Sequence, residues 1–61
     1  MTPDQIKALR HALGLTQERF AQLLHVSIQT VQMWEQGRAR PQQAMRHHLA
    51  ELAAMKGEVH P

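Results

Sequence analysis

The chain has 61 residues, of which 43% are hydrophobic and 20% charged, with a formal net charge of +2 and no cysteine. A chain this short forms one domain and buries only about 60% of its unfolded surface. The absence of cysteine excludes disulfides and thiolate metal sites, and no apolar run reaches the roughly 20 residues of a membrane span. We therefore expect a single cytoplasmic domain over residues 1–61.

The first helix is predicted from about Pro3 to Gly14. Residues 2–5, TPDQ, supply a capping hydroxyl, a proline at the first helical position, an acid near the positive helix end and a glutamine that completes a capping box. Apolar residues at helical spacing should face the core. They are Ile6, Leu9 and Leu13. Gly14 is typical of a helix C-terminus.

Two short helices joined by a tight corner are predicted between Thr16 and Gly37. The first runs from about Gln17 to Leu24, and the hydroxyl of Thr16 can cap it. Its inward side chains are expected to be Phe20, Leu23 and Leu24. The short connection leaves room only for an abrupt turn, so the next helix, which Ser27 can cap, must cross the first steeply. This is the geometry of a helix-turn-helix.

The second of these helices, residues 27–36, has two distinct sides. At about 100° per residue, Val31, Trp34 and Glu35 fall within one sector, and the two apolar residues would hold the helix to the body. The opposite sector and its flank hold Gln29, Gln32, Met33 and Gln36. Glutamine carries a donor and an acceptor side by side, which matches the adenine edge in the major groove of DNA.

Several residues of this stretch follow the pattern of a known family. They are Thr16, Gln17, Phe20, Ala21, Leu24, Val26, Val31 and the pattern Trp-Glu-x-Gly-x-x-x-Pro at 34–41. Most of the chain thereby resembles the helix-turn-helix domains of phage repressors, Cro-like (XRE-type) proteins and related bacterial antitoxin regulators. The resemblance implies an all-α, compact orthogonal bundle of four or five short helices that regulates transcription. His25 stands where the family usually has a left-handed glycine, a conformation that histidine adopts at small cost.

Two charged residues are predicted to lie against the core. Arg10 falls at the edge of the buried stripe of the first helix, and Glu35 lies on the inward side of the third. In the resembling repressors an Arg and a Glu at these places form an internal ion pair, so we expect Arg10 and Glu35 to pair. The alternative is that both charged groups reach solvent along their stems.

The third helix is expected to enter the major groove of double-stranded DNA with its N-terminal part nearest the bases. The candidate base readers are Ile28, Gln29, Gln32 and Met33. Gln29 suits a bidentate contact to adenine, and Ile28 or Met33 suits a thymine methyl group. A place in the core is an equal alternative for Ile28, which lies about 60° from Val31.

Four residues are candidates for contacts to DNA phosphates. They are Gln17, Thr30, Arg38 and Arg40. The resemblance assigns Gln17, which lies in the first turn of its helix, where free amides can join its side chain on a phosphate. Charge assigns the two arginines, since residues 36–50 contain no acid but three arginines and two histidines. The plain alternative is a solvated surface that happens to be basic.

A fourth helix is predicted to start near Pro41, which suits a first turn, and to stop at Gly57. Its inward side chains are expected to be Met45, Leu49 and Leu52. Residues 58–61 should form a frayed tail. One domain reads few base pairs, so we expect a homodimer on a palindromic operator with half-sites about 34 Å apart. Ala54 and Met55 are the candidate dimer surface.

No catalytic, cofactor or metal site is expected. His47 and His48 are adjacent and the other histidines lie in separate segments, a spacing unsuited to metal ligands. No nucleophile and base are arranged for catalysis and no glycine-rich phosphate loop occurs, so the chain is predicted not to be an enzyme. The alternative to a DNA-binding repressor is an antitoxin-like or adaptor module whose apolar fourth helix binds a toxin or another protein partner.

Overall fold

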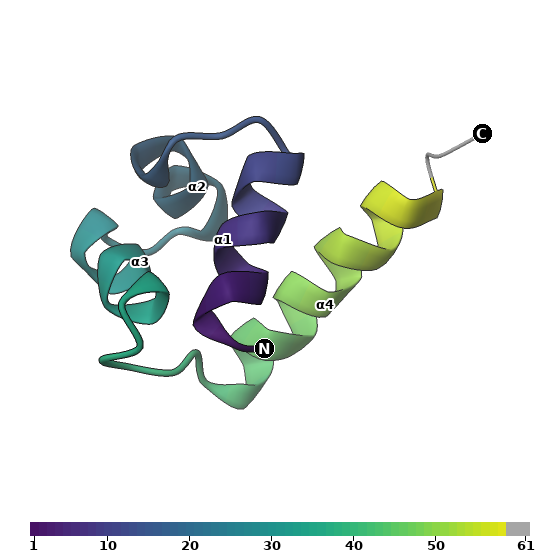
Figure 1. Ribbon diagram of the computed structural model, residues 1–61. Coiled ribbons are helices and arrows are strands. Elements are labelled where there is room, and N and C mark those ends of the chain that lie inside the picture. The colour runs from purple at the N-terminus through teal and green to yellow at the C-terminus, as the bar shows by residue number, and fades with distance from the viewer. Residues whose placement is uncertain (59–61) are drawn as a thin grey trace.

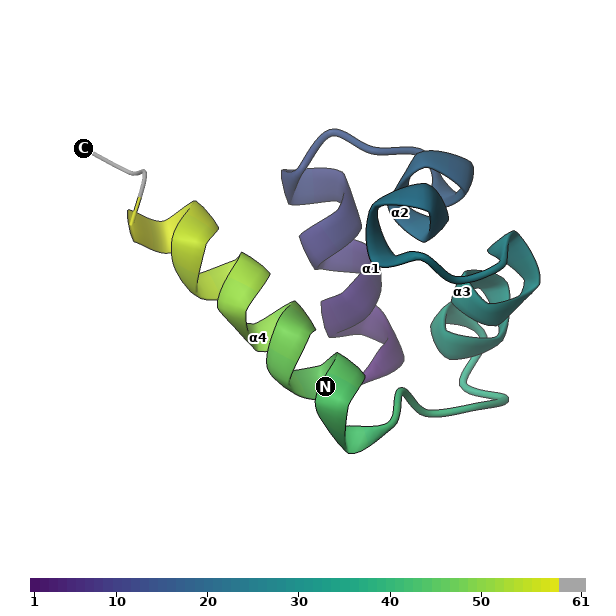
Figure 2. The same cartoon turned by 180° about the vertical axis from the view of Figure 1, so that it is seen from behind.

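The structure, a computed structural model, describes residues 1–58, with side chains up to residue 55. This part of the chain contains no strand and four α-helices: α1 (Pro3–Ala12), α2 (Gln17–Leu24), α3 (Ile28–Glu35) and α4 (Gln43–Glu58). Helices α1, α2 and α3 lie together, whereas α4 starts beside α1 and leans away from it toward its C-terminal end (Figure 1, Figure 2). The predicted all-α class is confirmed.

The first three helices begin where the sequence predicts, because a hydroxyl side chain precedes each. Thr2 accepts a hydrogen bond from the main-chain amide of Gln5 at 3.1 Å, and the Thr2 amide donates to Gln5 Oε1 at 2.9 Å, which completes the capping box. Thr16 and Ser27 each accept from the amide three residues later at 3.1 Å. These bonds satisfy amides that have no partner inside their helix.

The same three helices end in the same left-handed turn. Gly14, His25 and Gly37 have φ angles of 71°, 58° and 75°. The residue after each donates its amide to the carbonyl five residues earlier, at 3.1, 3.0 and 2.9 Å, which is the long bond of a Schellman motif. His25 therefore adopts the left-handed conformation expected at its position, and the turn between α2 and α3 is kept without glycine.

The core takes one almost completely buried side chain from each helix. They are Ile6, Phe20, Val31 and Leu49, none more than 1% exposed. Helix α3 contacts both α1 and α2, and α4 contacts mainly α1. The core therefore places α3 directly against α1 and α2, while α4 is held mainly through α1.

One residue predicted to face this core does not. Leu23 is 45% exposed, whereas Ala21 is only 3% exposed. At helical spacing Leu23 lies about 100° around the α2 axis from the middle of the buried side chains. Ala21 lies on the side that meets α3, where a small side chain lets the two helices approach closely.

Both predicted ends of α4 need correction. Pro41 is buried and precedes α4, whose first helical bond runs from the Arg46 amide to the Gln42 carbonyl at 2.8 Å. The proline therefore ends the loop instead of starting the helix. Gly57 does not stop the helix, which continues to Glu58, because glycine inside a helix costs only about 1 kcal/mol relative to alanine. The rest of the predicted tail, residues 59–61, lies outside the described residues.

Candidate nucleic-acid interface

Helix α3 is held to the body by one side. Val31 is completely buried, and Trp34 and Glu35 are 5% and 8% exposed. The exposed residues on the opposite side are Gln29, Met33 and Gln36. The phase predicted from the sequence is therefore the phase of the folded helix, and no described residue covers the side that carries Gln29.

Two of the candidate base readers lie on one flank of this exposed side. Gln32 is half-buried. Ile28 is also half-buried and packs against the core, and with Thr16, Gln17 and Glu18 it borders a hollow between the starts of α2 and α3. Of the two roles left open for Ile28, contact with the core is the one observed, while its remaining surface borders the hollow.

Arg10 and Glu35, expected from the family pattern to pair, are joined across α1 and α3 by two hydrogen bonds. Arg10 Nε donates to Glu35 Oε2 at 2.7 Å, and Arg10 Nη2 donates to Glu35 Oε1 at 3.1 Å. The side chains are only 12% and 3% exposed, so neither reaches solvent along its stem. Arg10 Nη1 also donates to the Leu15 carbonyl at 3.1 Å, which ties the α1–α2 connection to the same group.

The Glu35 carboxyl group is kept ionised by its surroundings. Burial alone would raise its pKa, but hydrogen bonds from Arg10 and Gln17, together with the charges of Arg10 and Lys7, outweigh that effect. The pKa of Glu35 is therefore lowered from its ordinary value of 4.5.

Gln17 takes part in this buried network. Its Nε2 donates to Glu35 Oε1 at 3.1 Å, and its Oε1 accepts from Gln32 Nε2 at 3.4 Å. The sequence pattern does not reveal these contacts, because they join residues 18 and 15 positions apart and depend on how α2 crosses α3. One feature of the sequence does point to a further partner. The carboxylate of a buried Glu35 has about four acceptor sites, and one arginine does not supply enough donors to fill them.

The main chain at the start of α2 remains available for a phosphate. The first bond of the helix runs from the Phe20 amide to the Thr16 carbonyl at 2.9 Å. The amides of Gln17 and Glu18 therefore have no partner within the helix, and they lie at its positive end. Such a group of amides is suited to an anion.

Thr30 and Arg40 border the same hollow on the other flank of α3. Its volume is about 330 Å³, and Trp34 and Met45 also line it. Thr30 Oγ1 lies 2.9 Å from Ser27 Oγ, so the hydroxyl is partly engaged by the cap of its own helix. Two of the four candidate phosphate contacts thus lie together, across α3 from Gln17.

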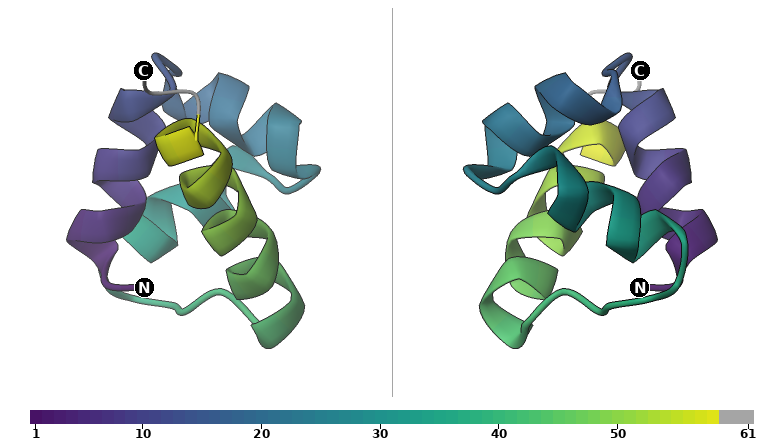
Figure 3. Two further views of the ribbon diagram at one scale, coloured as in Figure 1. Left: turned by 90° about the vertical axis from the view of Figure 1, so that its right-hand side faces the viewer. Right: turned by 90° about the vertical axis from the view of Figure 1, so that its left-hand side faces the viewer.

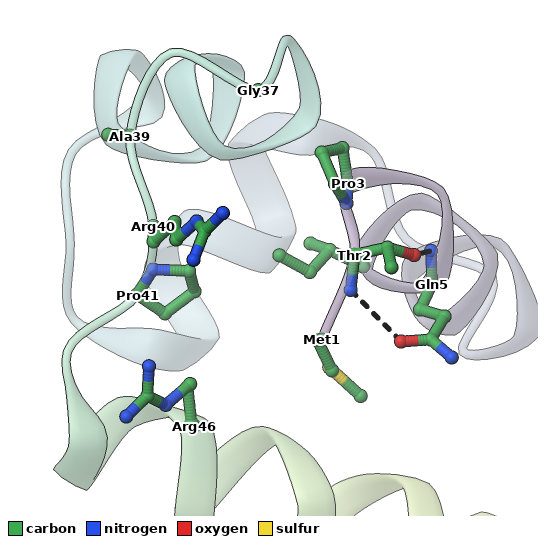
Figure 4. A pocket seen from close by; sticks show the side chains of 10 residues that line it. Met1, Thr2, Pro3, Gln5, Gly37, Ala39, Arg40, Pro41 and Arg46 are labelled. Atoms are coloured by element: carbon green, nitrogen blue, oxygen red, sulfur yellow. Dashed lines mark hydrogen bonds between the residues drawn. The ribbon is translucent and has the colours of Figure 1, made fainter.

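Three arginines give the neighbouring surface its charge. Arg38, Arg40 and Arg46 are exposed, and within the described residues none of them belongs to an ion pair. Arg40 and Arg46 border one hollow of about 390 Å³, which no acidic residue lines (Figure 4). The hollow forms because the α3–α4 connection passes close to the N-terminus of the chain (Figure 3).

Two other kinds of feature are absent from the part of the chain that the structure describes. No three histidine, aspartate or glutamate side chains gather closely enough there to hold a metal ion. None of its helices combines the length and apolar character required to cross a membrane.

Comparisons with known proteins agree with this geometry. A family model described as Helix-turn-helix matches residues 6–45. Over 41 residues the chain is 42% identical to a protein named Antitoxin HigA-2 from Vibrio cholerae serotype O1 (strain ATCC 39315 / El Tor Inaba N16961), a match that covers 67% of this chain and 39% of the relative. The chain therefore spans well under half the length of this relative. No solved structure gives a significant match.

The matched segment contains α2, α3 and the connection that carries Arg38 and Arg40, whereas Arg46 lies just beyond it. The segment begins in α1, includes the corner between α2 and α3, and ends within α4. Since the match covers more than half of the chain, and since α2 and α3 meet at a tight left-handed turn, the chain belongs to the helix-turn-helix family.

Proposed function

We propose that this chain binds double-stranded DNA sequence-specifically and acts as a transcriptional repressor, with α3 in the major groove. The observation that carries the proposal is the position of α3. Val31, Trp34 and Glu35 hold it from one side, the carboxamides of Gln29 and Gln36 are exposed on the other, and Gln32 lies on the flank. An α-helix with one free polar side is what the major groove admits.

Base reading falls to the side chains on the free face and its flank. Gln29 is exposed and suits a bidentate contact to adenine, while Met33, 43% exposed, suits a thymine methyl group. Gln32 approaches from the flank. Ile28 contributes only the part of its surface that the core leaves open.

Phosphate contacts lie on both sides of these readers. On one side the free amides of Gln17 and Glu18 form a phosphate site at the start of α2. On the other side lie Thr30 and Arg40, and Arg38 follows the end of α3. Contacts on both flanks fix the orientation of the helix between the two strands.

The unit that acts on an operator is a homodimer. One recognition helix contacts few base pairs, and two copies related by a two-fold axis would read a palindrome with half-sites about 34 Å apart. The C-terminal half of α4, which leans away from the body and exposes Met55 by 58%, is the proposed contact between the copies.

A second candidate function is binding to a protein partner. The similarity to a protein named as an antitoxin favours it, as does the exposed apolar surface of α4. In this alternative α4 binds the partner, and the arginines contribute only solubility.

A duplex-binding titration at two salt concentrations separates the two functions. Sites are first selected from a random duplex pool, and binding to a selected site and to a scrambled one is then measured. A DNA-binding regulator prefers the selected site and loses affinity steeply with salt. Absence of duplex binding at low salt would instead support the protein-partner function.

A further inference from the structure

We propose that Glu35 fixes the orientation of two carboxamides in series, Gln17 and then Gln32, so that Gln32 presents an acceptor to the DNA and selects adenine over guanine. The inference rests on the proposed function and adds a determinant of specificity to it. It concerns which atom Gln32 turns outward, a property that a glutamine side chain alone leaves undetermined.

The series starts at a group that can only accept. The Glu35 side chain is 3% exposed and ionised, so its two oxygens carry no hydrogen to donate. Arg10 occupies one oxygen at 2.7 Å and shares the other at 3.1 Å. Gln17 approaches the shared oxygen at 3.1 Å and must therefore turn its nitrogen toward it.

The orientation of Gln17 determines that of Gln32. With its nitrogen directed to Glu35, Gln17 presents its oxygen to the neighbouring carboxamide. Gln32 Nε2 donates to that oxygen at 3.4 Å, a long bond but one with a single allowed polarity. If Gln32 were rotated by 180° about its terminal bond, two oxygens would face each other.

Gln32 is left with its oxygen and its second N–H. The oxygen can accept from the amino group of adenine or cytosine, and the remaining N–H can also donate to N7 of adenine. In the major groove guanine presents the acceptors N7 and O6, and thymine presents the acceptor O4. The fixed oxygen of Gln32 would therefore face O6 of guanine or O4 of thymine, and no hydrogen bond forms between two acceptors. Adenine is therefore the preferred partner and guanine is the disfavoured purine.

Gln29 provides the contrast within the same helix. Its side chain is exposed, and no hydrogen bond joins it to another described residue. It is free to rotate and can donate to guanine as readily as it can pair with adenine. The structure thus contains one carboxamide with a fixed orientation and one without.

The first experiment examines the free protein and needs no DNA. Side-chain amide resonances are recorded by NMR for the wild type, for Gln17→Met and for Gln22→Met, a matched change at an exposed position of α2. A through-space signal between the Gln32 amide hydrogens and Gln17 is expected in the wild type and in Gln22→Met. If the wild type gives no such signal, the series does not form and the proposal is overturned, whatever the protein does to DNA.

The second experiment measures base choice. Gln32→Ala identifies the operator position at which discrimination is lost, and all four bases are then compared at that position. The wild type and Gln22→Met should prefer adenine to guanine by roughly 5- to 100-fold, which corresponds to one bidentate contact. In Gln17→Met the ratio should fall toward one, because Gln32 can rotate. Loss of a phosphate contact by Gln17 would weaken binding to all four duplexes alike and leave this ratio unaffected.

The outcomes separate the inference from the function beneath it. If every variant binds selected sites but Gln17→Met keeps the full preference for adenine, the orientation of Gln32 is not set by Gln17 and the inference is wrong. If no variant prefers any site, the proposed function fails, and the base choice assigned to Gln32 is overturned with it. If Gln17→Met does not fold, Gln17→Ala removes the same acceptor with a smaller side chain and should likewise lose the adenine preference, and an unchanged preference would equally overturn the inference.

Discussion

Gln29 shows most simply how one residue of α3 could contribute to sequence choice. It is exposed, belongs to the first turn of the helix, and lies opposite the buried residues that hold α3. A side chain with these properties can be removed without disturbing the core, so any loss of binding reports on the DNA contact alone.

Gln29→Ala is expected to weaken binding to the selected site by about 1 to 3 kcal/mol and to leave binding to scrambled DNA nearly unchanged. The reason is that a base contact carries sequence information while a phosphate contact does not. Equilibrium titration of both duplexes measures the difference. Gln36→Ala, at the exposed C-cap of the same helix, is the control and should have little effect on either.

Arg38→Ala is expected to weaken both duplexes alike. Arg38 is an exposed cation outside any ion pair in the described residues, and its contact would release about one counterion. The slope of log affinity against log salt should therefore decrease by about one. If Gln29→Ala and Arg38→Ala gave the same pattern on the two duplexes, the division into base readers and phosphate contacts would be wrong.

His25→Gly is expected to raise the free energy of unfolding by up to about 1 kcal/mol, since a residue with a Cβ atom pays for a left-handed conformation. His25→Val, with a branched side chain at the same φ of 58°, should lower it by about 1 kcal/mol or more. Urea unfolding of the two variants measures both. Equal stabilities would show that the turn does not constrain residue 25.

At the scale of elements, the pair formed by Arg10 and Glu35 joins α1 to α3. Removing one partner would leave the other charge buried and unpaired, which costs about 3 to 5 kcal/mol. Gln17 adds α2 to the same carboxylate. Glu35 on α3 thus accepts hydrogen bonds from side chains of both α1 and α2.

This arrangement predicts a pH dependence of stability. The pKa of Glu35 is lower in the folded protein than its ordinary value of 4.5, so the stabilisation is complete above that value and is lost as pH falls through the folded-state pKa. Urea unfolding from pH 7 to pH 2 should show a decrease that begins below about pH 4.5. Glu35→Gln should reduce this decrease, whereas Glu51→Gln, at an exposed carboxylate, should retain it.

Sequence patterns predicted the elements where the determinant is local. The hydroxyl caps and the residues that tolerate a left-handed turn gave the ends of α1, α2 and α3, and helical spacing gave the buried side of α3. Leu23 and Pro41 were misplaced because packing between elements decides those positions, and Gly57 was misplaced because glycine interrupts a helix only weakly. The partners of Gln17 could not be predicted, because they depend on the angle between two helices.

At the scale of the whole molecule, α4 is the element least enclosed by the rest. Leu49 enters the core and Leu52 packs against it, but the helix leans away from α1 toward its C-terminal end (Figure 1) and leaves Met55 58% exposed. A helix in this position can serve a contact between two copies while both α3 helices remain free for DNA.

The proposed homodimer predicts a spacing rule for the operator. Two inverted half-sites separated by one helical turn, about 34 Å, should be bound together, because both recognition helices then face the same side of the duplex. Inserting about five base pairs between them turns one half-site to the opposite side and should abolish joint binding. A mobility-shift series with increasing spacers measures this, and binding that is indifferent to the spacer would contradict the dimer.

The core cluster, with one almost fully enclosed side chain from each helix, implies that a piece of this chain lacking any of the four helices does not fold by itself. A fragment that ends before Leu49 would lack one of these four buried core side chains. The remaining three, Ile6, Phe20 and Val31, would then become more exposed to water. Denaturation should accordingly be all-or-none, with helical content and Trp34 fluorescence lost at one midpoint. The recognition surface would vanish in that same transition, since its supporting helix has no stability apart from the whole.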